Sequence, residues 1–276
     1  MKNIFGRPCI PLVVAPHTTL TASQQWLVTL CALLSVANNE RLNTIASIED
    51  YAQMRRGLYT QWGIHDRTSF LEIEESLSRL SSKTAYEAVW AEIRRMYPDY
   101  LCGSQAASVK SFKDGLRIFG FGVCHEIALR HKTKQAIRRL AAQEIEINGT
   151  PVQEKFQTSL TWFVGLAAAN IDARQVNNLV AWDIARFIFL SRNACDLGWI
   201  SEAEFFELCA PAARLAQQSY ASWKDFLDAH FVAAMIWQYN EGRHWLLQDA
   251  HSSLLNTPSS PVLVLPWHLN LDFIDK

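Results

Sequence analysis

The sequence predicts an all-α protein: one compact domain of about ten helices around a central apolar helix, with extended tails at both ends. Three observations support this fold class. Apolar residues recur at helical spacing over most of the chain, strand-like alternation is nearly absent, and capping signals separate the periodic segments. With 276 residues, of which 49% are hydrophobic and 19% charged, the chain can bury a sizeable core.

The first third of the chain contains four predicted helices after an extended, proline-containing start over residues 1–19. Thr21 is a suitable cap for the first helix, and Ser47 to Asp50 has the spacing of a capping box that opens the second. Asp66 can cap the third. The predicted ranges are 21–37, about 47–61 closed by Trp62-Gly63, 66–80, and 83–96 before Pro98.

The middle of the chain, residues 99–149, is the least regular part and could be an insertion between two helical parts of the single domain 1–276. Gly115, Gly120 and Gly122 argue against a long helix there. Residues 126–143 have a basic helical pattern, and the alternation over 144–148 predicts a loop or a short edge strand.

The second half has the clearest helix signals. Thr150-Pro151 resembles a helix start, Asp172 can cap the central helix, and Gly198 can end it. Ser201 and Glu204 form a second capping box. The predicted helices cover about 150–170, 172–198, 201–217, 222–237 and 241–251, followed by an irregular and extended tail over 256–267.

The central helix is predicted from residues 179–190, which are apolar except for Asp183 and Arg186. A helix that is apolar on nearly all sides lies inside a protein, where charges are rarely buried unless they are paired. The spacing of three places both charges about one turn apart. We therefore expect an internal ion pair, while a carboxylate of raised pKa in an apolar pocket is the functional alternative.

Distinctive strings occur at Trp62 to Arg67 and at Ala181 to Glu202, with weaker ones between about residue 20 and 267. In this order they resemble the bacterial family catalogued as domain of unknown function 1266, although Ser81-Ser82 departs from the glycine-histidine pair usual in that family. The resemblance implies an all-helical bacterial cytoplasmic protein, without an established activity, cofactor or catalytic residue. Some members look encoded among chaperone- or toxin-associated genes, which points to interaction roles.

We predict a candidate polar pocket formed by charged residues of the two sequence strings just named. In one hypothesis, His65 and Arg67 face Asp183 and Arg186 across a cleft, and Arg192 extends the set. In the alternative, Asp66 and Arg67 only shape a turn between helices, and Arg192 pairs with an acidic helix. The two hypotheses differ in whether these side chains are exposed into a cavity.

The other motifs give little chemistry. Arg130, Lys134 and Arg138 share one helix face, which is either solvated or a docking surface for an acidic partner. Metal-ligand spacings, a P-loop and nucleophile motifs are absent from the sequence, so we expect no metal and no cofactor. The net charge of −1 makes nucleic acid an unlikely main partner.

Composition also bears on the compartment. The six cysteines show no CxxC spacing, which favours reduced thiols in the cytoplasm. The first apolar run is broken by prolines, and no run of about 18 apolar residues exists, so neither a signal peptide nor a spanning helix is expected. We predict a non-enzymatic protein–protein interaction module (an adaptor, regulator or toxin-neutralising partner). The alternative is an enzyme or small-ligand binder with a pocket around Asp183, Arg186 and Arg67.

Overall fold

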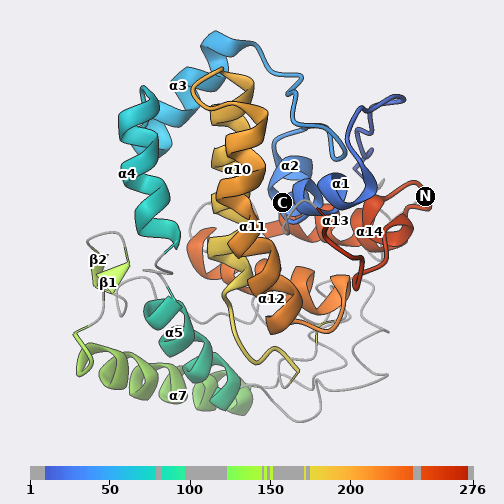
Figure 1. Cartoon of the computed structure of the whole chain (residues 1–276). Helices are drawn as coiled ribbons and strands as arrows, with labels where there is room; N and C mark the ends of the chain where they lie inside the picture. Colours follow the sequence, from blue (N-terminus) through green and yellow to red (C-terminus); the bar gives the residue numbers. More distant parts are fainter. Residues whose placement is uncertain are drawn as a thin grey trace. The chain divides into compact units, whose positions relative to one another are not determined.

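The all-α prediction is confirmed by a computed structural model of the chain, shown in Figure 1. The structure describes residues 10–78, 83–96, 123–144, 146–147, 150–151, 171, 175–238 and 244–272. It divides into two compact units, which we call the α10 unit (residues 10–81, 180–230 and 253–276) and the α5–α7 unit (residues 1–9, 82–179 and 231–252). The single domain over 1–276 stays a prediction.

The α10 unit is built around the predicted central helix, α10 (Ala181–Asp196). Nearly all of its side chains are buried, as expected for a helix that is apolar on most sides. It packs against four other helices of the unit: α1 (Ala22–Thr29), α2 (Ala32–Ala37), α4 (Arg67–Ser78) and α11 (Glu202–Ser219). The unit also holds α3 (Tyr51–Trp62), α14 (Pro261–Val264) and the first half of α12 (Trp223–Gln238).

Local capping signals place most helix ends of the α10 unit as predicted. The Thr21 and Ser201 hydroxyls accept hydrogen bonds from the backbone N–H groups of Gln24 and Glu204, and both capping boxes are complete. At the C-terminal ends of α3 and α10, Gly63 and Gly198 have φ of +71° and +73°, the left-handed conformation that glycine adopts at low cost. These helix ends depend on residues only a few positions away along the chain, so they can be predicted from the sequence.

The predicted start of the second long helix is wrong. Helix α3 begins at Tyr51, and its cap is Asp50, whose carboxylate accepts hydrogen bonds from the N–H groups of Ala52 and Gln53. The Ser47 hydroxyl lies outside α3: it donates to the buried carboxylate of Glu40 and accepts a hydrogen bond from the N–H of Glu49 at 2.9 Å. It therefore does not bind the N–H group that the predicted capping box required.

The start of α10 also differs from the prediction. Residues 176–179 are not helical, and α10 begins at Ala181 with Val180 as a cap that contributes no side-chain hydrogen bond. The backbone N–H of Ala181 instead donates to the hydroxyl of Tyr220 at 2.9 Å. The predicted cap, Asp172, lies outside the described residues. A tertiary contact therefore satisfies the first N–H group of α10, which has no partner within the helix.

Three tryptophans attach the C-terminal tail to the α10 unit. The rings of Trp26, Trp223 and Trp267 have centroid distances of 4.8 to 5.1 Å. Trp223 Nε1 donates to the carbonyl of Leu265 at 2.8 Å, and Trp267 Nε1 donates to the carbonyl of Tyr220 at 2.9 Å. The tail is not extended throughout, since α14 interrupts it.

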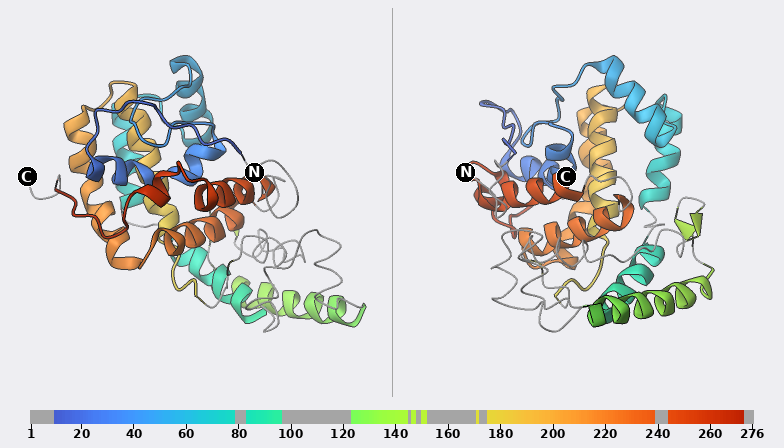
Figure 2. Two further views of the ribbon diagram at one scale, coloured as in Figure 1. Left: turned by 90° about the vertical axis from the view of Figure 1, so that its right-hand side faces the viewer. Right: turned by 180° about the vertical axis from the view of Figure 1, so that it is seen from behind.

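The α5–α7 unit contains α5 (Lys83–Met96) and α7 (Val123–Ala141), which lie side by side in Figures 1 and 2. The Arg139 guanidinium binds the buried Glu92 carboxylate, with Nη2 at 2.6 Å from Oε2. A short antiparallel pair, β1 (Glu146–Ile147) and β2 (Thr150–Pro151), follows α7. The unit also holds the second half of α12 and most of α13 (His244–Asn256).

Strand β2 corrects the helix start that Thr150-Pro151 predicted, because both residues pair with β1 instead. The remainder of that predicted helix, residues 152–170, and the glycines at 115, 120 and 122 lie outside the described residues. Within the described part of the chain, no helix has the length and apolar character needed to cross a membrane.

Candidate functional site

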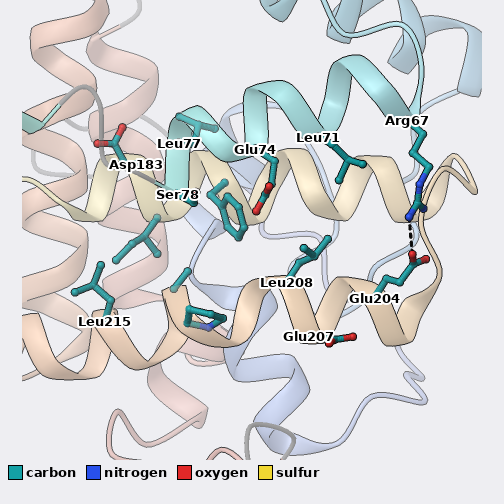
Figure 3. A pocket seen from close by; sticks show the side chains of 14 residues that line it. Arg67, Leu71, Glu74, Leu77, Ser78, Asp183, Glu204, Glu207, Leu208 and Leu215 are labelled. Carbon is teal, nitrogen blue, oxygen red and sulfur yellow. Dashed lines mark hydrogen bonds and ion pairs between the residues drawn. The ribbon is translucent and has the colours of Figure 1, made fainter.

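A pocket of about 530 Å³ lies in the α10 unit, with α4 and α11 as its walls and α10 as its floor. Figure 3 shows side chains of α4 and α11 facing each other across α10. This volume is within the range of ordinary ligand pockets, ~300–1,000 Å³. The lining residues are Arg67, Leu71, Glu74, Leu77, Ser78, Asp183, Ile184, Phe187, Glu204, Glu207, Leu208, Pro211, Ala212 and Leu215.

One end of the pocket is closed by an ion pair between its two walls. Arg67 Nη2 lies 2.7 Å from Glu204 Oε1, and Arg67 Nη1 donates to the carbonyl of Trp199 at 2.7 Å. Arg67 is held in place because Asp66 caps α4, accepting a hydrogen bond from the N–H of Ser69 at 2.8 Å. The guanidinium therefore ties the first turn of α4 to the start of α11.

The carboxylate of Glu204 takes part in both an ion pair and a helix cap at this end of the pocket. Its hydrogen bond from Arg67 and those that link it to Ser201 in the capping box lower its pKa to about 2. These interactions favour the charged carboxylate, so it stays ionised throughout the physiological pH range. Arg67 and Ser201 therefore fix the position of the Glu204 carboxylate, although the Glu204 side chain is 40% exposed.

We expect the Arg67–Glu204 pair to make the free energy of unfolding depend on pH in the acid range. The lowered pKa of Glu204 means that its contribution is complete above pH 4.5, the ordinary value, and is lost as the pH falls toward about 2. Urea unfolding should therefore show the wild type more stable than Glu204→Gln at pH 6, with the difference shrinking toward pH 2. Glu202→Gln, at an exposed position in the same turn, is the control. A difference that is independent of pH would contradict this role.

At the floor of the pocket, Asp183 is paired with Arg186. The Arg186 Nη2 group donates to Asp183 Oδ1, and the two side chains are 5% and 2% exposed. The Arg186 guanidinium carbon also lies 4.9 Å from the ring centroid of Trp182 and 5.5 Å from that of Trp62. Asp183 lines the pocket but is nearly covered, and Arg186 is not among the lining residues.

Arg192 lies elsewhere in the α10 unit. It is 1% exposed, and its guanidinium donates to the carbonyl of Ile45 at 2.9 Å and to the hydroxyl of Ser35 at 3.1 Å. Arg192 Nη2 lies 3.6 Å from Oε2 of the buried Glu40. The acidic partner that the sequence suggested for Arg192 is thus found, in the connection between α2 and α3 rather than in a helix.

The structure brings together only part of the predicted polar pocket. Arg67 and Asp183 line the same cavity, whereas His65 does not line it. His65 is an exposed residue beside Asp66, with Nε2 at 3.6 Å from Oδ2. Arg186 and Arg192 are buried in ion pairs of their own.

Glu74, Glu207 and the apolar walls of the pocket were not predicted from the sequence. Partial burial in the pocket and the charge of Glu75 raise the pKa of Glu74 above its ordinary value. One signal was available, since Pro211 stands inside the 201–217 helix and lines the cavity. Proline has no N–H, so the carbonyl of Glu207 loses the donor that a helix normally supplies.

The three cysteines of the α10 unit are poor nucleophiles. Burial raises the pKa of the Cys31 and Cys209 thiols, and partial burial with nearby carboxylates raises that of Cys195 to about 11. All three are free thiols. Over the ranges that the structure describes, no group of three or more histidine, cysteine or acidic side chains could hold a metal ion.

The predicted basic surface lies on α7. Lys134 and Arg138 are exposed there, while the side chain of Arg130 is outside the described part of the chain. The neighbouring Arg139 is bound to Glu92 across the α5–α7 contact. The exposure of Lys134 and Arg138 is compatible with both a solvated face and a docking surface, so the basic surface stays a prediction.

The sequence model of the family described as "Protein of unknown function (DUF1266)" matches residues 57–267, which is more than half of the chain. The chain belongs to this family. The match contains both walls of the pocket and its floor. No curated protein and no solved structure matches the chain.

Proposed function

We propose that this DUF1266 protein is a protein–protein interaction module that binds a segment of its partner in the pocket between α4 and α11. The observation that carries the proposal is a half-open pocket with apolar walls along about three turns of two helices. We place the protein in the bacterial cytoplasm, which the family resemblance and the three free thiols support.

The charged groups around the pocket support binding over chemistry. Glu204 is bound by Arg67 and by the cap of α11, and Asp183 is bound by Arg186. The hydrogen bonds to Glu204 lower its pKa, and the ion pair fixes the orientation of Asp183, which suits a scaffold. Apolar side chains such as Leu71, Leu208 and Leu215 provide most of the contact area.

The alternative function is an enzyme or small-ligand binder that uses the same cavity. The volume of about 530 Å³ fits a small molecule, and the raised pKa of Glu74 is a property that acid–base groups share. The two functions differ in what occupies the pocket. A small ligand would co-purify with the monomer, whereas a protein segment would contact the pocket walls only when the partner is present.

Site-specific photo-crosslinking in the native host tests the proposal. A benzoylphenylalanine at Leu215, which lines the pocket, should crosslink to one protein, and peptide mapping should find one segment of it. The same group at Gln218, exposed on α11 outside the pocket, is the control. Equal crosslinking from both positions, or a co-purifying small molecule without a protein crosslink, would contradict the proposal.

Filling the pocket should remove the interaction. Ala212 lines the cavity on α11, so Ala212→Phe is expected to reduce capture of the crosslinked partner at least about tenfold, because the added ring occupies the space of an apolar anchor. Ala203→Phe adds the same ring at an exposed position of α11 and should leave capture unchanged. Circular dichroism spectra that match the wild type would show that both variants are folded.

A further inference from the structure

We propose that the occupant of the α4–α11 pocket is a short amphipathic helix with lysine or arginine residues along the edges of its apolar face. This inference rests on the proposed function and adds the chemistry of the partner. Two features of the pocket support it independently: the helical spacing of its walls and the charge of its rim.

The walls have the length and spacing that an inserted helix requires. On α4 the lining residues run from Arg67 to Ser78, and on α11 they run from Glu204 to Leu215. Each stretch spans eleven residue steps, or about 17 Å at 1.5 Å per residue. A helix that presents apolar side chains at i, i+3, i+4, i+7 and i+11 spans the same eleven steps, and helix-binding grooves recognise apolar side chains at this spacing.

Most of the charged side chains that line the pocket are carboxylates. Among the described residues that line the pocket, Glu74, Asp183, Glu204 and Glu207 are the carboxylates and Arg67 is the single cation. Asp183 and Glu204 are neutralised by Arg186 and Arg67. Among the described residues, neither Glu74 nor Glu207 has a cationic partner, so the pocket offers two uncompensated negative charges.

Pro211 adds an acceptor near the same place. Because proline cannot donate, the backbone carbonyl of Glu207 lacks its helical hydrogen bond on a wall of the pocket. An ammonium or guanidinium group could bind both this carbonyl and the carboxylate of Glu207. Figure 3 shows the carboxylate of Glu74 on the opposite wall, between the two ends of the pocket.

Two synthetic helical peptides of about 15 residues test this inference. Both carry leucines at i, i+3, i+4, i+7 and i+11, and their edge positions are lysine in one and glutamate in the other. Fluorescence polarisation with the full-length protein should show the lysine peptide binding at least about tenfold more tightly. Ala212→Phe should abolish this binding, and Ala203→Phe should not.

A matched pair of double variants isolates the rim charges. Glu74→Gln with Glu207→Gln should weaken the lysine peptide about fivefold to tenfold, as expected for two partly exposed ion pairs. Glu72→Gln with Glu202→Gln removes the same charge from exposed positions of α4 and α11 outside the pocket, and should change the affinity less than about twofold.

The inference is overturned if the two peptides bind equally or if both double variants have the same effect. It is also overturned if dodecylammonium occupies the pocket while the lysine peptide does not. A Leu215 crosslink to an acidic or extended partner segment would contradict the helix while leaving the interaction module intact. The absence of any protein crosslink would reject both.

Discussion

Replacing Arg192 with leucine is expected to lower the free energy of unfolding by about 3–5 kcal/mol. The substitution leaves Glu40, which is 4% exposed, as a buried carboxylate without its cation. It also removes the donors that the carbonyls of Ile45 and Ala46 accept from. The connection between α2 and α3 is then held to α10 by fewer hydrogen bonds, so both the charge and the packing are lost.

Urea unfolding followed by circular dichroism measures this effect. Arg55→Leu, at an exposed arginine of α3, is the control and should change stability by no more than about 0.5 kcal/mol. A milder variant, Arg192→Lys, keeps the charge but not the planar set of donors, and should lie between the two. A loss below about 1 kcal/mol for Arg192→Leu would contradict the structural role of this pair.

Asp183→Leu is the second substitution with a large expected effect, about 3–5 kcal/mol, because it removes the carboxylate that the buried Arg186 guanidinium binds. The rings of Trp62 and Trp182 remain beside the guanidinium but cannot replace the lost charge. The loss should again appear in urea unfolding. Stability, not recognition, is expected to depend on this pair.

A double-mutant cycle separates architecture from function at this position. Combining Asp183→Leu with Arg186→Met removes both charges, so the double variant should recover stability relative to Asp183→Leu, with a coupling energy of roughly 1–3 kcal/mol. The recovered variant should still bind the lysine peptide within about threefold of the wild type. Recovered stability with lost binding would instead assign Asp183 to the binding site.

Local signals predicted much of the helix pattern. The caps at Thr21, Asp66 and Ser201 and the glycine stops at Gly63 and Gly198 all involve groups within a few residues of one another. Their hydrogen bonds form whenever the local chain is helical, which is why reading the sequence located them. The apolar run from residue 179 to 190 likewise predicted a buried helix, and its two charges predicted their own partner at a spacing of three.

The wrong predictions have two kinds of physical cause. Two of them involve other partners within seven residues: the Ser47 hydroxyl, expected to cap α3, donates to Glu40, and Thr150-Pro151, expected to start a helix, pairs as a strand with β1. The start of α10 depends instead on the hydroxyl of Tyr220, which is 39 residues away. Local helix propensity is weak compared with such alternative contacts, so it does not decide the outcome by itself.

Periodicity and neighbours within one or two turns are enough to predict the fold class, most helix boundaries and the internal ion pair of α10. The candidate site, in contrast, depends on contacts between distant segments of the chain. Arg67 and Glu204 are separated by 137 residues, and the walls of the pocket come from α4 and α11, which meet only because both pack on α10. The pocket exists because the packing leaves a space between the facing sides of α4 and α11. The sequence of one helix carries no information about which side of the other helix will face it.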